Sequence, residues 1–318
     1  QWNTYSEGLK TSVLSTTQPT ELRSTIDRLE VPNIKSNVVT TAPPSGKPPT
    51  NDKIITVETP IAEITISLVG GDVTQIRLKD YPVSLKNPET PIALLDTDQR
   101  IYIAQTGLVG PDGPDASTDG RPIYTANQSH FNVTDPTTIV IQTETEAGLV
   151  IKKLFYVSPT NYDIGVTLNI TNNSSSPKEV TPFVQLKRDN SVDPSIQNSM
   201  GMQAFLGFAL PTLDDRYRKV AFSDFETEAD ARELNADLKA KGITGGYLAL
   251  LQHYFTTAWI PDPDIDHLYT FRTNQQGHFI GSIISPNLTV PSGEIIATEA
   301  TLYVGPKDQN VLEQLSPG

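Results

Sequence analysis

Residues 164–170 read Ile164-Gly165-Val166-Thr167-Leu168-Asn169-Ile170, with a large apolar side chain at every second position. A period of two is that of a β-strand with one face buried and the other exposed. The stretch soon meets Asn172-Asn173-Ser174-Ser175-Ser176-Pro177, whose residue types favour turns. This combination predicts a strand that ends in a chain reversal, as in antiparallel β proteins.

The same pattern recurs through most of the chain. Residues 64–68 alternate apolar and polar side chains, and Gly70-Gly71-Asp72 separates them from a second alternating run at 76–78, which predicts a hairpin. β-branched and aromatic residues predict further strands at Ile139–Thr143, Leu149–Val157, Glu179–Leu186, Tyr247–Tyr254, Phe279–Ile284 and Ile295–Val304. Many short strands divided by turns indicate an all-β sandwich.

Two helices are expected among these strands. Glu228–Lys241 is rich in Ala, Glu, Leu and Lys, with Thr227 placed to cap its start and Gly242 to end it. A shorter helix is expected near Asp308–Leu315, with Val311, Leu312 and Leu315 on one face. We expect that face to pack on the sandwich.

Composition narrows the possible functions. The chain has 318 residues, no Cys and a formal net charge of −13. Without Cys it has no thiol nucleophile, disulfide, Cys-ligated zinc or iron–sulfur cluster. The acidity argues against nucleic acid and anionic lipid as partners. No apolar run approaches the roughly 18 residues of a membrane span.

Residues 1–52 differ from the rest of the chain. They hold two aromatic residues, Trp2 and Tyr5, many Thr and Ser, and a Pro-rich end at residues 43–49. Such a composition buries too little apolar surface to offset its ordering entropy. We therefore expect a flexible linker at 1–52, a sandwich at 53–306 and a C-terminal helix at 307–318. The linker is neutral, so the negative charge lies on the folded part.

The sequence shows no catalytic or metal-binding pattern. The four histidines, His130, His253, His267 and His278, are scattered, and no two have the spacing of a local metal pair. Asp262, Asp264 and Asp266 alternate as in a calcium loop, but His267 stands where an EF-hand needs Gly and Thr273 where it needs Glu. We expect no catalytic residues, metal or cofactor, and an acidic solvated loop at these aspartates.

Several motifs occur in an order that resembles a known family. They are Val69–Val73, Tyr102–Leu108, Gly110–Asp115, Arg121–Tyr124, Gly245–Pro261 and Thr301–Lys307. This series resembles the large periplasmic domain of the YidC membrane protein insertases of Gram-negative bacteria, from about Ile54 to the C-terminus. The Gly245–Pro261 stretch is the most specific part.

The resemblance implies a β-supersandwich, similar in architecture to galactose mutarotases. It implies a periplasmic location, with residues 1–52 following a transmembrane helix and the last helix leading to the next membrane span. The expected role is a non-enzymatic docking or scaffold surface during insertion and folding of inner-membrane proteins. Partners would be SecDF, components of the Sec translocon and nascent inner-membrane proteins. The family's insertion groove lies in the membrane region, so no residue here inherits that step.

By the same resemblance, Asp215, Tyr217, Lys219 and Phe222 are candidates for the SecDF contact, and an ordinary sandwich edge is the alternative. Two other functions stay open. One is carbohydrate or polymer binding in a mutarotase-like groove, although mutarotation itself needs a positioned carboxylate and imidazoles. The other is chaperone-like binding on an exposed apolar face.

Overall fold

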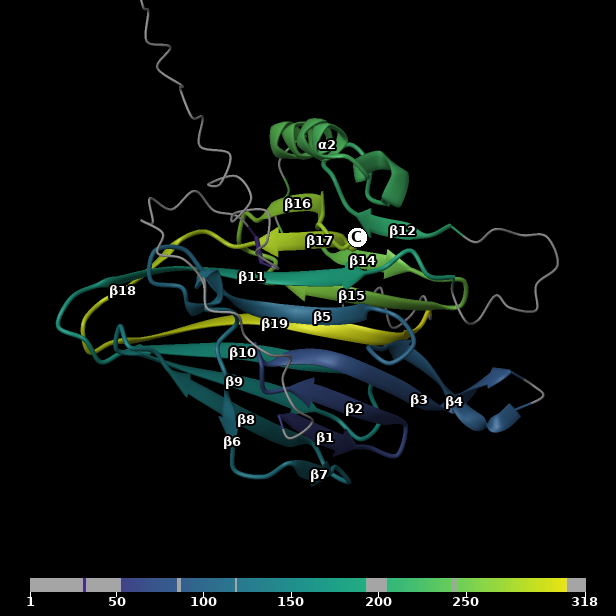
Figure 1. The fold of residues 1–318 in the computed structure, drawn as a ribbon, viewed down its shortest axis with the longest axis horizontal. Helices are drawn as coiled ribbons and strands as arrows, with labels where there is room; N and C mark the ends of the chain where they lie inside the picture. The colour runs from purple at the N-terminus through teal and green to yellow at the C-terminus, as the bar shows by residue number, and fades with distance from the viewer. Residues whose placement is uncertain are drawn as a thin grey trace, which may run out of the picture.

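Two β-sheets form the body of the molecule (Figure 1). The computed structural model describes residues 31–32, 53–84, 87–117, 119–192, 205–241, 243 and 245–307. Within these residues, the apolar faces of the two sheets meet in one continuous core. The predicted all-β sandwich is therefore confirmed.

The first sheet has ten strands in the described part of the chain. Its order is β16 (Leu268–Thr273), β17 (Phe279–Ile284), β11 (Lys178–Arg188), β5 (Tyr102–Val109), β3 (Asp72–Ser84), β2 (Ala62–Ser67), β1 (Ile54–Glu58) and β7 (His130–Asn132). In addition, β18 (Leu288–Val290) pairs with β11 and β4 (Asn87–Leu95) with β3. Strands β1 and β7 run parallel, and the other pairings of this sheet are antiparallel.

The second sheet has nine described strands, all paired antiparallel. Its order is β13 (Arg218–Ala221), β12 (Gly207–Leu210), β14 (Leu248–Leu251), β15 (Phe255–Pro261), β19 (Ile295–Pro306), β10 (Asp163–Asn172), β9 (Leu149–Val157), β8 (Thr137–Glu144) and β6 (Thr125–Ala126). The alternating run at 164–170 is the middle of β10, where Ile164, Val166, Leu168 and Ile170 all enter the core.

The hairpin predicted around Gly70-Gly71 is also confirmed, between β2 and β3. Gly70 and Gly71 have φ of +75° and +64°, the left-handed region that glycine adopts at little cost. A Cβ atom on Gly71 would lie 2.8 Å from the side chains of both Ile141 and Lys153. This turn therefore lies pressed against the second sheet.

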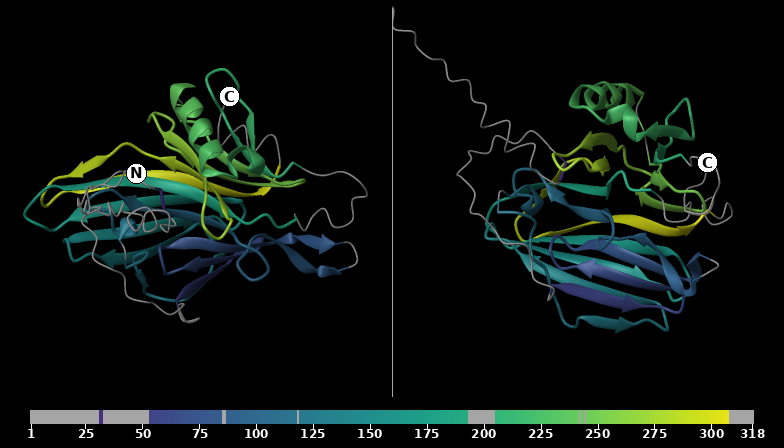
Figure 2. Two further views of the ribbon diagram at one scale, coloured as in Figure 1. Left: turned by 45° about the horizontal axis from the view of Figure 1, so that its top comes forward. Right: turned by 45° about the vertical axis from the view of Figure 1, so that its right-hand side comes forward.

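Helix α2 spans Glu228–Lys241, as predicted. The backbone N–H of Asp230 donates to the Thr227 hydroxyl oxygen over 3.2 Å, which is the expected cap. Asn235 makes two hydrogen bonds to the backbone of Phe271 on β16, of 2.9 and 2.7 Å. The helix thus lies over β16 at one end of the sandwich, as Figure 2 shows. Two short 3₁₀ helices, η1 (Pro114–Ala116) and η3 (Phe222–Phe225), complete the described helices.

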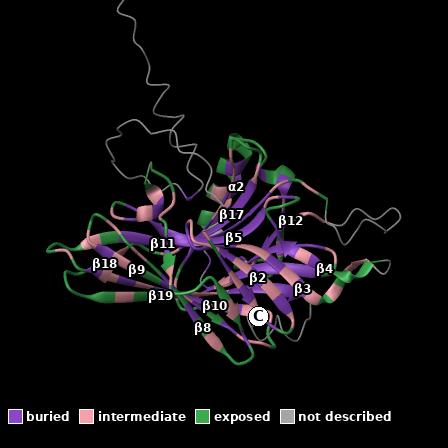
Figure 3. Cartoon of the chain, turned by 60° about the horizontal axis from the view of Figure 1, so that its bottom comes forward, coloured by how far each residue is buried: buried purple, intermediate pink, exposed green. Residues whose placement is uncertain are grey.

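An aromatic cluster fixes this helical end to the sheets. Phe208, Phe222, Phe225, Phe271 and Phe279 lie in contact, with ring centroids 4.2–6.1 Å apart. Elsewhere, buried positions gather in the middle of the strands and exposed ones in the connecting loops (Figure 3).

Parts of the predicted organisation fall outside the described residues. The expected helix at Asp308–Leu315 lies there, as does the linker at 1–52 apart from residues 31 and 32. Both remain predictions. In the part of the chain that the structure describes, no helix is long and apolar enough to cross a membrane.

Removing the ring at the centre of the aromatic cluster tests how much the cluster contributes to the free energy of unfolding. Phe225→Ala deletes a fully buried ring that contacts four other rings. We expect the free energy of unfolding, measured in urea, to fall by about 3–5 kcal/mol. The exposed α2 residue Lys239, changed to Ala, should alter it by less than about 0.5 kcal/mol. Equal effects of the two changes would contradict the assignment of the cluster as the anchor of α2.

Candidate functional site

Three of the four candidate contact residues lie together at the β12–β13 hairpin. Tyr217 is 49% exposed, and Asp215 and Lys219 are exposed as well. The Lys219 Nζ lies 5.6 Å from the centroid of the Tyr217 ring and 5.2 Å from that of Phe205. The backbone N–H of Tyr217 donates to Asp215 Oδ1 over 2.9 Å. We call Asp215, Tyr217 and Lys219 the hairpin patch.

Tyr247 supports this patch from the adjoining loop. Its hydroxyl donates to the Arg216 carbonyl oxygen over 3.2 Å. Burial, aided by the nearby Tyr217 and Asp215, raises the pKa of Tyr247 to about 12. The Tyr247 hydroxyl is therefore neutral and able to donate at any physiological pH. Burial also raises the pKa of Tyr217.

Phe222, the fourth candidate, does not share the patch. It is 6% exposed and stacks on Phe279, with ring centroids 4.2 Å apart and planes 6° from parallel. This side chain belongs to the aromatic cluster of the core. Phe222 is the first residue of the short helix η3, which the sequence did not predict, so the inward direction of its side chain was not foreseen.

The strand next to the patch, β13, forms one edge of the second sheet. Arg218 on this strand forms an ion pair with Asp237 of α2 at 2.6 Å. The backbone N–H of Ala221 donates to the Asp224 carboxylate over 2.8 Å. A short edge strand with charged side chains and occupied backbone groups resists pairing with another strand. Contact at this place would therefore use side chains.

A second, buried site was not predicted. Arg121 donates two hydrogen bonds to the Asp72 carboxylate, of 3.0 and 3.1 Å. Its Nε also donates to Asp115, and its Nη2 to the carbonyl oxygens of Gly70 and Thr106 over 3.3 and 3.0 Å. Both carboxylates are buried. Although burial opposes its charge, Asp115 and then Asp72 raise the pKa of Arg121, which stays protonated.

Lys153 supplies the second cation of this network, from β9 in the opposite sheet. It is fully buried, and its Nζ donates to the carbonyl oxygens of Gly70, over 2.6 Å, and Thr106. The Nζ also lies 5.2 Å from the centroid of the Tyr124 ring. Burial lowers the pKa of Lys153 to about 8, against the pull of the two carboxylates. Two cations thus face two anions, which we call the buried ion network.

A row of polar side chains continues from this network across the first sheet. Gln105 donates to Asp72 over 2.7 Å, and Gln185 donates to Gln105 over 2.8 Å. The Gln185 oxygen accepts from Ser282 over 3.1 Å and from Arg272 over 3.3 Å. Each side chain of the row thus makes a hydrogen bond to its neighbour, as buried polar groups generally do. The row joins β3, β5, β11, β17 and β16.

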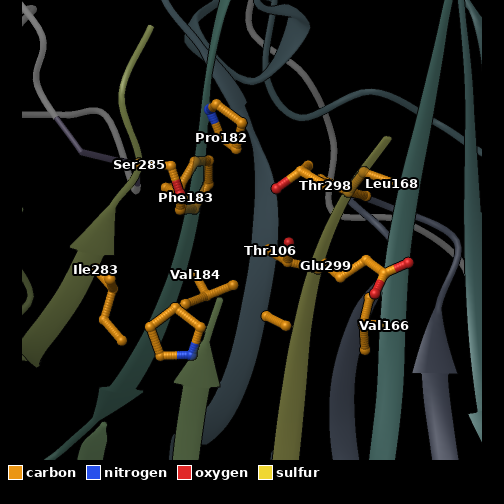
Figure 4. Close-up of a pocket in the computed structure, with 12 residues that line it drawn as sticks. Thr106, Val166, Leu168, Pro182, Phe183, Val184, Ile283, Ser285, Thr298 and Glu299 are labelled. Atoms are coloured by element: carbon orange, nitrogen blue, oxygen red, sulfur yellow. The ribbon is translucent and has the colours of Figure 1, made fainter. Parts of the chain in front are cut away.

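A small cleft opens between the sheets (Figure 4). Strands β10 and β19 line one wall, and β11 and β17 the other. Its lining is mostly apolar, and Glu299 carries the one ionisable side chain among the residues that line it. His267 does not line the cleft, but its Nδ1 lies 3.3 Å from the hydroxyl of Ser285, which does.

The remaining histidines lie apart. His130 is exposed on β7, and His253 packs edge-on against Tyr254. The backbone N–H of His278 donates to Asn274 Oδ1 over 2.9 Å, and its Nδ1 lies 3.3 Å from the Asn274 amide nitrogen. Among the described residues, no group of three or more His, Asp or Glu side chains is placed to hold a metal ion.

Fold and surfaces together define a large two-sheet β-sandwich domain with an exposed tyrosine at the β12–β13 hairpin. Residues 54–318 match the family described as the YidC periplasmic domain, and the chain belongs to that family. Among its relatives, the membrane protein insertase YidC of Azotobacter vinelandii is 38% identical over 279 residues, or 87% of this chain and 48% of that protein. The YidC of Pseudomonas syringae pv. syringae is 39% identical over 293 residues, or 91% and 50%.

The chain therefore spans about half the length of the curated relatives that it matches. Its family assigns it to the periplasm, as expected from the sequence. Among solved structures, a galactose mutarotase-like protein from Lactobacillus casei aligns with TM-score 0.49 and 9% identity, over 79% of this chain and 99% of that one. A crystal structure of an active YidC insertase aligns with TM-score 0.36 and 13% identity, over 84% and 42%.

The pH dependence of stability tests the buried ion network. In the folded chain the pKa of Lys153 is about 8, against 10.5 for an unperturbed lysine. Between pH 8 and 10.5 the unfolded chain therefore binds more protons, and the stability contributed by this residue rises with pH. Wild type should gain stability relative to Lys153→Met across this window, on the order of a few kcal/mol, and show no such drift below pH 8.

Urea unfolding at intervals from pH 6 to 10.5 measures this difference. The matched control is Lys152→Met, at the exposed neighbouring position, which should follow the wild-type curve. Parallel curves for wild type and Lys153→Met would show that Lys153 does not release its proton in the folded chain.

Proposed function

We propose that this chain is a non-catalytic accessory domain of a membrane protein insertase. In this role it offers a docking or scaffold surface while inner-membrane proteins are inserted and folded. Family membership supports the connection to insertion. Because the chain spans about half of each relative, the insertion step itself would belong to the other part of the protein. SecDF and other Sec translocon components are the proposed partners.

The observation that carries the docking role is the hairpin patch. An exposed tyrosine held by a lysine over its ring offers a large contact area that loses little entropy on binding. Tyrosine is enriched among the residues that dominate the energy of protein interfaces. The flanking Asp215 adds a carboxylate, so the patch presents an apolar ring between opposite charges. A periplasmic protein with a complementary charged and apolar surface would fit it.

We propose that the predicted helix near Asp308–Leu315, called the last segment below, packs on the outer face of the second sheet. Ala209, Ala249 and Ala258 lie there side by side on β12, β14 and β15 with Tyr303, and all four are buried. The described chain leaves this place at Lys307, whose backbone N–H donates to the Tyr254 carbonyl oxygen over 2.9 Å. Small side chains allow close approach of a helix, which would bring Val311, Leu312 and Leu315 onto the alanines.

Replacing the patch tests the docking role. In the full-length insertase, the pair Tyr217→Ala and Lys219→Ala should weaken association with SecDF at least about tenfold, or ~1.4 kcal/mol. Affinity is measured by titration of purified SecDF in detergent. Tyr254→Ala removes a tyrosine that is 61% exposed elsewhere on the domain, and should leave the affinity unchanged. Equal affinity of the patch variant and wild type would remove the hairpin patch as the docking site.

Charge on the last segment tests its packing. Leu312→Asp and Leu315→Asp should each destabilise the domain by about 2–4 kcal/mol, since a carboxylate would enter an apolar contact. Gln314→Asp introduces the same charge between them and should have little effect. Thermal unfolding monitored by circular dichroism gives the comparison. If all three changes act alike, the leucines do not face the sandwich.

A further inference from the structure

The turn that joins β12 to β13 carries the most exposed large apolar side chain among the described residues. Leu213 is 83% exposed, whereas Val192, which comes next, is 71% exposed. Leu213 stands two residues before the first member of the hairpin patch. Single exposed apolar side chains are common on protein surfaces, so exposure alone does not identify a contact site. What distinguishes Leu213 is how firmly its turn is held.

Thr212 fixes the tip of this turn. Its backbone N–H donates to the Asp215 carbonyl oxygen over 2.7 Å, and the backbone N–H of Asp215 donates to the Thr212 carbonyl oxygen over 3.3 Å. The Thr212 hydroxyl donates to Asp214 Oδ1 over 2.7 Å and accepts from the backbone N–H of Asp215 over 3.2 Å. Thr212 itself is buried. Leu213 therefore projects from a turn that backbone and side-chain hydrogen bonds close.

The two ends of the loop are held as well. A Cβ atom on Gly246 would lie 2.6 Å from Pro211 Cγ, so Pro211 packs directly on the backbone of Gly246. At the other end, the Tyr247 hydroxyl donates to the Arg216 carbonyl oxygen over 3.2 Å. An ordered loop loses little conformational entropy when a partner covers it, which favours binding through the side chain at its tip.

We propose that Leu213 is the apolar anchor of the docking surface and that it enters an apolar pocket of a partner protein whose rim carries cationic side chains. The pocket follows from the exposed leucine, because its burial removes apolar surface from water. The cationic rim follows from Asp214 and Asp215, two exposed residues directly after the leucine. The cation of the hairpin patch, Lys219, is instead held over aromatic rings. This inference rests on the proposed docking function and adds which side chain enters the partner.

Truncation of the leucine tests the anchor in the full-length insertase. With SecDF as the probe, Leu213→Ala should weaken association at least about tenfold, in the same titration as for the hairpin patch. The matched control is Ile295→Ala, which truncates an aliphatic side chain that is 63% exposed on β19, three strands from β12 in the sheet. The control should bind like wild type. An affinity unchanged by Leu213→Ala would overturn the anchor.

The variant of the hairpin patch separates this inference from the proposed function. If Tyr217→Ala with Lys219→Ala weakens association and Leu213→Ala does not, the anchor is wrong and the docking role stands. If Leu213→Ala alone weakens association, the anchor stands and the contact lies at the tip of the turn. If SecDF does not bind the wild-type protein, or if all variants bind like wild type, both proposals are wrong.

Further variants test the chemistry of the contact. Leu213→Met keeps an apolar side chain and should bind within about threefold of wild type, whereas Leu213→Asp should bind at least as weakly as Leu213→Ala. Asp214→Asn keeps an acceptor oxygen for Thr212 but removes the charge. It should weaken association several-fold at low ionic strength and less at high ionic strength. Equal losses for Leu213→Met and Leu213→Asp would overturn the apolar pocket, and full affinity of Asp214→Asn at low ionic strength would overturn the cationic rim.

One last variant tests the ordered turn. Thr212→Val keeps Leu213 but removes the hydroxyl that closes the turn, and should weaken association several-fold because the partner must then order the loop. Circular dichroism checks that this variant and the others are folded at the assay temperature. Full affinity of Thr212→Val would overturn the role of the ordered turn.

Discussion

The buried ion network links the two sheets at one point through directional hydrogen bonds. Arg121 holds Asp72 and Asp115 on the side of the first sheet, while Lys153 reaches across from the second sheet to the carbonyl oxygens of Gly70 and Thr106. Removal of one member of a buried ion set leaves an uncompensated charge, which typically costs about 3–5 kcal/mol. An apolar core tolerates small sliding of one sheet over the other. This network does not, because its hydrogen bonds are directional.

The same network explains two other features of the molecule. It holds the Gly70-Gly71 turn in place, where a larger residue at Gly70 would meet Arg121 and one at Gly71 would meet Lys153. It also holds Asp115 over Gly107, where a larger side chain would collide with the carboxylate. The buried ion network, as well as the apolar core, therefore determines where the Gly70-Gly71 turn and Asp115 lie.

The sequence could predict the strands and α2 because local patterns determine them. Residues 164–170 alternate strictly, and Glu228–Lys241 has helix formers, a cap residue and a glycine after its end. It could not predict the ion network, because Asp72, Asp115, Arg121 and Lys153 are each ordinary polar residues within their own segments and meet only after the sheets form. Phe222 illustrates the same limit. The resemblance made it a contact candidate, whereas η3 places its ring on Phe279 in the core.

The hairpin patch and the buried network divide the polar residues of the domain into two kinds. Lys153 is fully buried and the Arg121 side chain is 9% exposed, and both make their hydrogen bonds within the domain. Lys219 instead places its ammonium group near two aromatic rings, at an exposed position where a partner could replace the water around the ammonium group. Exposed ion contacts are weak in water and strengthen when an interface excludes it. The cation over Tyr217 is therefore worth most when the patch is covered, which is the behaviour expected of a docking surface.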